Sequence, residues 1–336
     1  MRKINKYVLE WHDSEKNTGG VKAKQDAVTF LKKDGFISIE VPSSKVGKVW
    51  SSFWARYILR NLSGIIVIQY PSGKPFLRKL WLEAACKNKK LKVILLIHDL
   101  ESIRFFNDSK YSDVRQSEFE FIAKADGLVA LNERMKSLLV KGGIVKPITT
   151  LDAWDYDNKN PIIEKKDYQR RICYAGNLRK ALFLSDLKCK TSIYVFGPNS
   201  KTTFSKSIKY MGQFSPQKLP SHLNGDYGLV WDGVSSETCE GMYGQYLRYN
   251  TPHKFSLYIS SGLPVIVWDK AAIAEFVKKY NVGLTISNLN DIDNLLHSVP
   301  SSQYKELQKN VIKVAEKMRN GQFLTTAIND LIKKID

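Results

Sequence analysis

Residues 175–180 read AGNLRK and combine side chains suited to binding phosphate. The segment follows an apolar run and precedes a helical one. Gly176 permits a tight turn, Asn177 can cap the following helix, and Arg179 presents a planar fork of donors that matches phosphate oxygens. The pattern predicts a diphosphate site. The competing interpretation is an ordinary helix cap followed by a solvated arginine.

A second basic candidate, Lys254, follows a tyrosine-rich segment and comes early in an expected helix. Pro252 precedes it, so the ammonium group would lie at a helix N-terminus, where free N–H groups and the helix dipole favour phosphate. The alternative is a loop that covers the core with its aromatic rings, with His253 as a capping residue. The same segment supplies four further substrate-binding candidates: Tyr246, Tyr249, Asn250 and Ser256.

A candidate for acid–base chemistry lies at residues 98–104, which read HDLESIR after a strongly apolar run. A carboxylate directly after a parallel strand faces the edge of the sheet where ligands bind. Asp99 could therefore remove a proton from an acceptor hydroxyl, with His98 as the competing base. Asp99 could equally cap the helix that follows.

The least specific pattern is NTGG at residues 17–20, between an apolar run and the expected start of a helix. Gly19 and Gly20 would let the backbone approach an anionic ligand at that helix N-terminus. The segment lacks the spacing of a dinucleotide-binding or P-loop motif, so a plain turn is the alternative.

The sequence contains no pattern of a metal centre or of another common catalytic motif. Its five histidines form no HxxxH or HExxH pair, and the acidic pairs at 155–157 and 291–293 supply too few carboxylates for a metal ion. GxSxG and kinase motifs are missing as well. The four cysteines are widely spaced, which indicates a reducing compartment. We therefore expect no metal and no bound cofactor.

The chain is strongly basic, with 52 lysines and arginines against 33 acidic residues and a formal net charge of +19. This charge predicts an anionic partner: a nucleotide phosphate, an anionic membrane surface or nucleic acid. The lysine-rich segment 87–92 has no interleaved aromatic residues, which disfavours nucleic acid. The apolar runs are too short to span a bilayer, and the N-terminus does not read as a signal peptide. We expect a cytoplasmic protein and leave peripheral contact with the inner membrane face open.

The candidate residues can form a site only if strands bring them to the same edge of a sheet. The hydrophobic pattern predicts such strands. Short apolar runs alternate with helical stretches at residues 7–11, 36–41, 64–70, 91–99 and 127–131, and again at 171–176, 192–198, 227–232, 263–269 and 282–287. The alternation predicts an α/β fold with two Rossmann-like, doubly wound parallel sheets. Two such sheets would face a central cleft, because ligands bind at the carboxyl ends of the strands.

The polar, proline-containing stretch between the two series of apolar runs predicts a domain boundary. We expect an N-terminal Rossmann-like domain over residues 1–155, a linker over 156–170 and a C-terminal Rossmann-like domain over 171–310. The apolar residues of the last part recur at helical spacing, which predicts C-terminal helices over 311–336.

Six segments, taken in order, resemble the GT-B glycosyltransferases that include the β-1,6-galactofuranosyltransferases: NTGG, HDLESIR, DAWDY, YAGNLRK, GLVWDG and YNTPHKFSLYISSGLPVIVW. They are also similar to the related glucosyltransferases that extend GlcNAc on serine-rich-repeat adhesins of streptococci and lactobacilli. The resemblance runs over most of the chain, and its most specific part is residues 249–268.

The resemblance implies a GT-B fold with an acceptor-binding first domain and a UDP-sugar held mainly by the second. On that pattern Arg179 and Lys254 hold the diphosphate. Phe214 stacks on or flanks the base, and Thr18 reaches the donor from the first domain. Phe214 stands where the adhesin glucosyltransferases carry tyrosine, so it lacks their hydroxyl. The remaining substrate-binding candidates are Asp232 and Glu275.

We therefore expect a metal-independent glycosyltransferase that moves a hexose from UDP-glucose or UDP-GlcNAc to a sugar acceptor, such as GlcNAc on a glycosylated serine-rich-repeat adhesin. One alternative is a galactofuranosyltransferase with a lipid-linked or polysaccharide acceptor. Another is a protein that binds a nucleotide-sugar or glycan without catalysis. The expected partners are the donor, a glycan or glycosylated-protein acceptor and further copies of the chain in a homo-oligomer, but not nucleic acid.

Overall fold

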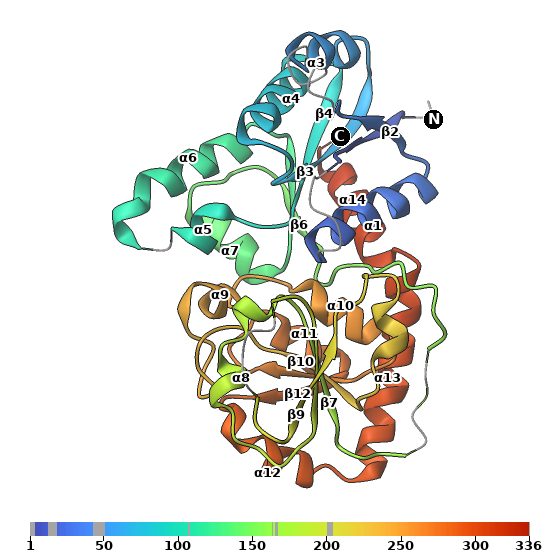
Figure 1. The fold of residues 1–336 in the computed structure, drawn as a ribbon. Helices are drawn as coiled ribbons and strands as arrows, with labels where there is room; N and C mark the ends of the chain where they lie inside the picture. Colours follow the sequence, from blue (N-terminus) through green and yellow to red (C-terminus); the bar gives the residue numbers. More distant parts are fainter. Residues whose placement is uncertain are drawn as a thin grey trace. The chain divides into compact units, whose positions relative to one another are not determined.

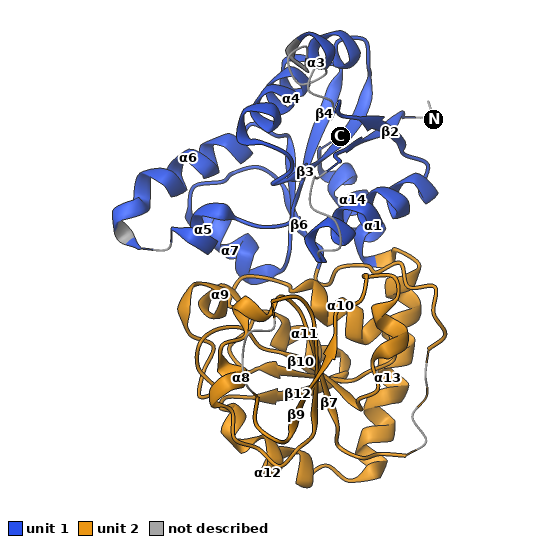
Figure 2. Cartoon of the chain, viewed as in Figure 1, with its two compact units in different colours: residues 1–151, 323–336 blue, residues 152–322 orange. Residues whose placement is uncertain are grey.

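The computed structural model describes residues 4–12, 19–42, 51–106, 108–162, 164, 167–199 and 204–335. The chain forms two compact units, shown in different colours in Figure 2: unit 1 contains residues 1–151 and 323–336, and unit 2 contains residues 152–322. Each unit is built around one sheet of six strands. The predicted α/β fold with two doubly wound parallel sheets is confirmed.

Unit 1 alternates strands and helices along the chain (Figure 1). Its strands are β1 (Lys6–Glu10), β2 (Ile37–Glu40), β3 (Gly64–Tyr70), β4 (Leu91–Ile97), β5 (Gly127–Ala130) and β6 (Ile148–Thr150). Its helices are α1 (Gly19–Lys33), α3 (Ser51–Leu59), α4 (Pro75–Lys87), α5 (Glu101–Phe105), the 3-10 turn η1 (Ser109–Tyr111), α6 (Ser112–Ile122), α7 (Glu133–Lys141) and the terminal α14 (Gln322–Ile335).

The strands of unit 1 are ordered β2-β1-β3-β4-β5-β6, and all neighbouring pairs are parallel. The central strands β3 and β4 are almost entirely apolar and buried, as expected for strands covered on both faces. The chain order reverses between β1 and β3. Such a switch point leaves a crevice at the carboxyl edge, where ligands of open α/β sheets bind.

Unit 2 repeats this plan with shorter helices after its first strands (Figure 1). Its strands are β7 (Ile172–Ala175), β8 (Ile193–Phe196), β9 (Ile208–Gly212), β10 (Tyr227–Val230), β11 (Val265–Trp268) and β12 (Gly283–Ile286). Its helices are η2 (Leu178–Lys180), α8 (Phe183–Asp186), η3 (Leu219–His222), α9 (Gly241–Tyr246), α10 (His253–Ser260), α11 (Ile273–Tyr280), η4 (Leu289–Asp291), α12 (Ile292–His297) and α13 (Ser301–Arg319).

The strands of unit 2 are ordered β12-β11-β10-β7-β8-β9, again with all neighbours parallel. The three central strands β10, β7 and β11 are buried along their whole length. Here the chain order reverses between β7 and β10. The loops that follow these two strands therefore flank the switch point of unit 2.

The last helix, α14, packs in unit 1, whereas α13 belongs to unit 2. Thr149 Oγ1 on β6 donates a hydrogen bond to Ala327 O of α14 at 2.9 Å. A Cβ on Gly127 of β5 would lie only 3.0 Å from Leu331 of the same helix. The helices expected as one terminal group over 311–336 are thus divided between the two units, because α14 adds its apolar face to the first core.

The polar segment expected as a linker, residues 156–170, lies within unit 2. Asn158 is buried and its Nδ2 donates to Ser260 O at 3.1 Å, while the Tyr156 hydroxyl donates to Pro216 O at 3.2 Å. Polar side chains of this segment satisfy backbone carbonyls of the second unit, which allows a hydrophilic sequence to pack. The boundary between the units falls after Leu151.

Candidate active site

The carboxyl edge of the sheet in unit 2 gathers several of the predicted binding residues. The loop after β7 carries Gly176 and Arg179, and Asp232 follows the end of β10. These loops flank the switch point, which is the usual ligand site of an open parallel sheet. The order of the strands therefore brings Gly176, Arg179 and Asp232 to the same edge of the sheet, although Asp232 is far from the other two along the chain.

Lys254 lies in the first turn of α10, and its ammonium group reaches three acceptors at this edge. Its Nζ atom is 2.7 Å from Asp232 Oδ1, 3.2 Å from the Tyr174 hydroxyl oxygen and 3.2 Å from Trp231 O. The side chains of Lys254 and Asp232 are only 12% and 13% exposed, so water screens this ion pair weakly. Since an ammonium group has three N–H donors, these contacts use all of them.

Tyr174, on β7, links the ion pair to the core of unit 2. Its hydroxyl donates to Asp232 Oδ1 at 3.0 Å, and Lys254 Nζ lies 4.5 Å from its ring centroid. Burial, followed by the nearby Asp232 carboxylate, raises the pKa of Tyr174 well above its ordinary value, so the hydroxyl keeps its proton and donates. The sequence analysis did not single out Tyr174. A tyrosine in an apolar strand, two residues before Gly176, is the signal that could have indicated it.

The turn after β7 leaves room beside this ion pair. Gly176 N donates to Phe196 O at 3.0 Å, and Gly197 packs so closely that a Cβ on it would lie 1.8 Å from Gly176 O. A Cβ on Gly176 itself would meet its first neighbour, Lys254 Nζ, at 3.6 Å. Gly197 therefore fixes the turn, while Gly176 keeps space next to the ammonium group.

Asn177 and Arg179 complete the turn. Asn177 Oδ1 accepts a hydrogen bond from Arg179 N at 3.1 Å and caps η2. The Arg179 side chain is exposed, and across the ranges the structure describes its guanidinium makes no hydrogen bond or ion pair. An exposed guanidinium of this kind is available to an anionic ligand.

Phe214 follows β9, one of the two edge strands of the sheet in unit 2, and is half-buried. The His222 ring stacks on it with 3.8 Å between ring centroids, and the Phe196 ring lies 6.3 Å away. His222 thus occupies one face of the Phe214 ring, which leaves only the opposite face for a nucleotide base. The predicted role of Phe214 in base binding stays a prediction.

The other candidates of unit 2 differ in exposure. Tyr246 at the end of α9 is 4% exposed, and Ser256 inside α10 is fully buried. Tyr249 and Asn250, between these helices, are half-buried, while Glu275 in the first turn of α11 is exposed. The burial of Ser256 keeps its hydroxyl away from a ligand at the surface. Tyr249, Asn250 and Glu275 are the members of this set that solvent reaches most readily.

In unit 1, His98 and Asp99 directly follow β4, as the sequence indicates. His98 is buried, with its Nε2 atom 2.8 Å from Gln69 Oε1. Asp99 is more accessible, and its Oδ2 atom accepts a hydrogen bond from Arg104 Nη1 at 2.8 Å. Asp99 is therefore the better placed of the two to meet a substrate hydroxyl, with Arg104 fixing its orientation.

The glycine pair of unit 1 forms the start of α1. Gly19 and Gly20 are exposed, and nothing lies within 4 Å of a Cβ placed on Gly20. The backbone there is open to close approach by a ligand. Thr18 lies outside the described residues.

The two acidic pairs do not gather into a larger group. Asp155 is buried, and Asp293 accepts hydrogen bonds from Lys190 N, Thr191 N and the Thr191 hydroxyl. In the part of the chain that the structure describes, no set of three or more His, Cys, Asp or Glu residues could hold a metal ion. None of the described helices has the length and apolar character needed to cross a membrane.

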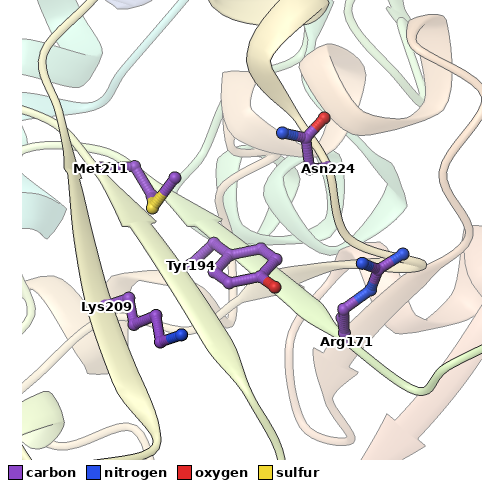
Figure 3. Close-up of a pocket in the computed structure, with 5 residues that line it drawn as sticks. All are labelled: Arg171, Tyr194, Lys209, Met211 and Asn224. Atoms are coloured by element: carbon purple, nitrogen blue, oxygen red, sulfur yellow. The ribbon is translucent and has the colours of Figure 1, made fainter.

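A separate pocket of about 380 Å³ lies over the outer strands β8 and β9 of unit 2. Arg171 immediately precedes β7 and Asn224 precedes β10, so the pocket reaches the amino edge of the sheet. In the view of Figure 3 the Tyr194 ring lies between Lys209 and Arg171. The full lining is Arg171, Tyr194, Lys209, Met211 and Asn224. None of the predicted site residues belongs to it.

Two family models match the chain. The glucosyltransferase 3-like N-terminal domain matches residues 5–153, and the C-terminal domain of the same description matches residues 172–331. The chain belongs to the glucosyltransferase 3-like family. It is a glycosyltransferase, and the predicted resemblance is confirmed.

Relatives of this glycosyltransferase point to two donor sugars. The β-1,6-galactofuranosyltransferase WbbI of Escherichia coli K12 is 30% identical over 341 residues, which covers 97% of this chain and 98% of WbbI. Glucosyltransferase 3 of Streptococcus gordonii is 23% identical over 246 residues, which covers 73% of this chain and 72% of that protein. These two names differ in the sugar that is transferred, so membership of the family fixes the reaction class alone.

A solved structure supports the fold of this glycosyltransferase. An α-glucosyltransferase in complex with UDP aligns with a TM-score of 0.59 over 99% of this chain and 100% of that one, at 10% identity. At such low identity the likeness shows the fold only. The predicted GT-B fold is confirmed.

Proposed function

We propose that this enzyme transfers a hexosyl group from a UDP-sugar to a sugar acceptor, with the diphosphate bound at the carboxyl edge of unit 2. The observation that carries the proposal is the position of Lys254. Its ammonium group lies beside the open turn at Gly176, at the switch point of the sheet. The exposed Arg179 follows in the same turn and would bind the diphosphate together with Lys254, whose ammonium group would exchange one of its present acceptors for a phosphate oxygen.

The proposed reaction breaks the bond between the anomeric carbon and the β-phosphate oxygen and joins that carbon to an acceptor oxygen. The leaving UDP takes the electron pair, and negative charge grows on its phosphate oxygens. Lys254 and Arg179 would stabilise this charge. Their two positive charges supply what a divalent cation provides elsewhere, so the proposal includes no metal cofactor. The acceptor hydroxyl proton would pass to Asp99, the accessible carboxylate after β4.

The remaining candidates would bind the parts of the donor beyond the diphosphate. Phe214 has one ring face that could stack on the uracil. Tyr249, Asn250 and Glu275 are accessible and could bond hydroxyls of the sugar or ribose. Support for uridine as the base comes from the UDP bound to the α-glucosyltransferase of similar fold.

For the donor, glucose or GlcNAc is the first candidate, with GlcNAc on a serine-rich-repeat adhesin as the acceptor implied by the sequence resemblance. The name of the glucosyltransferase 3 relatives supports glucose. One observation favours a second candidate, galactofuranose with a lipid-linked or polysaccharide acceptor. The galactofuranosyltransferase WbbI is more similar to this chain than the glucosyltransferase 3 relatives are, and its similarity extends over nearly the whole chain. A cytoplasmic location and a homo-oligomeric state stay predictions.

A calorimetric and thermal-shift screen tests the donor site. The ligands are UDP, GDP, UDP-glucose, UDP-GlcNAc and UDP-galactofuranose, and the proteins are the wild type, Arg179→Ala and Lys188→Ala. Lys188 is an exposed cation of the same unit outside the turn, so its variant controls for lost surface charge. A ligand at about 100 times its Kd should stabilise the folded protein by about 2.7 kcal/mol.

We expect uridine ligands to stabilise the wild type and the Lys188→Ala variant, and GDP to have little effect. Arg179→Ala should bind uridine ligands at least about tenfold more weakly, since it removes a charge-assisted contact. The UDP-sugar that binds most tightly identifies the donor. Equal binding to wild type and Arg179→Ala would overturn the assignment of the diphosphate to this turn.

A further inference from the structure

A long stretch of unit 1 is basic and contains no acidic residue. Between Glu40 and Glu83 the sequence has seven lysines and arginines and no aspartate or glutamate. One other stretch of similar length, residues 187–225 in unit 2, also has no acidic residue. The stretch between Glu40 and Glu83 creates a positive potential around α3 and the first two turns of α4, which lie in it.

Four of these cations form no ion pair within the described ranges, although Lys79 acts electrostatically on Glu83 one turn further along α4. Arg56, Arg60, Lys74 and Lys79 are exposed and make no ion pair there. Arg78 differs, because it pairs with Glu101 of α5. The charge of the four is therefore available to an external anionic partner.

The helix α3 also exposes large aromatic side chains among these cations. Phe53, Trp54 and Tyr57 are 58%, 42% and 51% exposed, and Phe76 in the first turn of α4 is 69% exposed. The rings of Phe53 and Tyr57 are parallel with centroids 6.0 Å apart, and the Arg60 guanidinium lies 5.7 Å from the Tyr57 centroid. Three exposed aromatic residues on one nine-residue helix are unusual, because their burial is normally favourable.

The exposed aromatic face is not the side by which α3 packs. Ala55 and Leu59 are fully buried, so the helix already has an inward face. Asn88, which caps α4, donates to Leu59 O and Leu62 O at the end of α3, and the two helices lie side by side (Figure 1). The fold of unit 1 therefore uses one face of α3 and leaves the aromatic and cationic face uncovered.

We infer that this face binds the surface of an anionic lipid bilayer. The α3 surface consists of Phe53, Trp54, Arg56, Tyr57, Arg60 and Phe76. Its aromatic rings suit the level of the lipid headgroups, where Trp and Tyr gather at membranes, and its cations suit anionic headgroups. An amphipathic helix of this composition lies in the plane of the interface. The inference does not depend on which sugar the enzyme transfers.

The positive charges of the α3 surface argue against a second copy of the chain as the partner that binds there. In a twofold interface the same surface patch faces itself, so Arg56 and Arg60 would meet like charges. The acid-free stretch offers them no carboxylate in return. An anionic bilayer supplies negative charge over the whole face and an apolar layer beneath it for the rings.

Vesicle co-sedimentation of the full chain tests this inference. The vesicles are phosphatidylcholine alone and phosphatidylcholine mixed with phosphatidylglycerol, each at low and at high salt. The variants are Arg56→Glu/Arg60→Glu and Phe53→Ser/Trp54→Ser/Tyr57→Ser. The matched control is Lys309→Glu/Lys313→Glu, which reverses two exposed charges on α13 of unit 2. Circular dichroism and sedimentation velocity check folding and oligomeric state.

We expect the wild type and the α13 control to bind the anionic vesicles at low salt and to leave them at high salt. Loss of each cation should weaken partitioning about fivefold, so the arginine reversal should weaken it by at least about 25-fold. The serine variant should lose binding and remain folded. Absence of wild-type binding at low salt, or equal binding by the arginine variant and the control, would refute the lipid surface. If the variants instead change the oligomeric state, the face is a subunit interface, and the inference is wrong.

Trp54 gives a second readout that separates lipid from nucleic acid. Lipids brominated near the headgroup should quench wild-type fluorescence more than that of a Trp54→Phe variant, because an inserted Trp54 contacts the bromine atoms. Binding to a single-stranded oligonucleotide, together with no such difference in quenching, would favour nucleic acid and contradict the proposal.

Discussion

The ion pair between Lys254 and Asp232 can be tested by a double-mutant cycle on the stability of unit 2. The variants are Lys254→Met, Asp232→Asn and the double substitution. At 2.7 Å the Coulomb attraction of two unit charges is about 6 kcal/mol with an effective dielectric constant of about 20, and desolvation offsets much of it. Lys254→Met should cost about 3 kcal/mol, because a mostly buried carboxylate loses its cation. Asp232→Asn keeps an acceptor oxygen and should cost about 2 kcal/mol.

The double variant leaves neither charge unpaired, so we expect it to cost about 2.5 kcal/mol rather than the additive sum of about 5 kcal/mol. The difference is a coupling energy of about 2.5 kcal/mol. Urea unfolding followed by circular dichroism measures it, and a separate transition of unit 1 would serve as an internal control that should not shift. Additivity within about 0.5 kcal/mol would show that the two groups do not interact strongly, and would refute the interpretation that this ion pair holds the Lys254 ammonium group in place.

Two further predictions concern the turn and a thiol. Gly176→Ala should change the free energy of unfolding by no more than about 0.5 kcal/mol, because the added Cβ would lie 3.6 Å from Lys254 Nζ. The same variant should bind UDP about tenfold more weakly, because the methyl group would occupy the space through which the phosphate approaches. Gly197→Ala should instead destabilise unit 2, because its Cβ would lie 1.8 Å from Gly176 O, so equal stability of the two variants would contradict this geometry. Burial raises the pKa of Cys86 to about 11, so its alkylation at pH 8, followed by mass spectrometry, should be roughly two orders of magnitude slower than that of an ordinary thiol. The rate should rise about tenfold per pH unit up to that pKa, and a plateau near pH 8.5 would show that the thiol is not shifted.

Of the twelve strands in the described residues, ten could be predicted because each coincides with a short apolar run of the sequence. The two that could not be predicted lack such a run. β6 (Ile148–Thr150) has three residues, and β9 (Ile208–Gly212) exposes Tyr210 and Met211 as the edge strand of its sheet. In both cases pairing with a neighbouring strand, rather than the local hydrophobic pattern, defines the strand. Similarly, the periodicity of α14 predicts a helix but not the core against which it packs.

The positions of the candidate site residues could be predicted to the level of the strand that precedes each of them. Each of Gly176, Asp232 and Asp99 follows a parallel strand, and parallel strands end at the same edge. The sequence could not predict which side chains contact one another. Tyr174 reads as a core residue of β7, and only the pairing of β7 with β10 brings its hydroxyl to Asp232. Similarly, the complete burial of Ser256 depends on the packing of α10.

If a diphosphate binds at Lys254 as proposed, the present contacts of its ammonium group require an exchange of partners. Its three N–H donors are already shared among Asp232, Tyr174 and Trp231. A phosphate oxygen must therefore replace one acceptor, and the contacts at 3.2 Å to Tyr174 and Trp231 are weaker than the charged contact at 2.7 Å to Asp232. The Tyr174 hydroxyl also donates a hydrogen bond to Asp232, so it keeps a partner when its contact with Lys254 is lost. The ion pair with Asp232 would then persist and hold the ammonium group in place while one N–H turns to the phosphate.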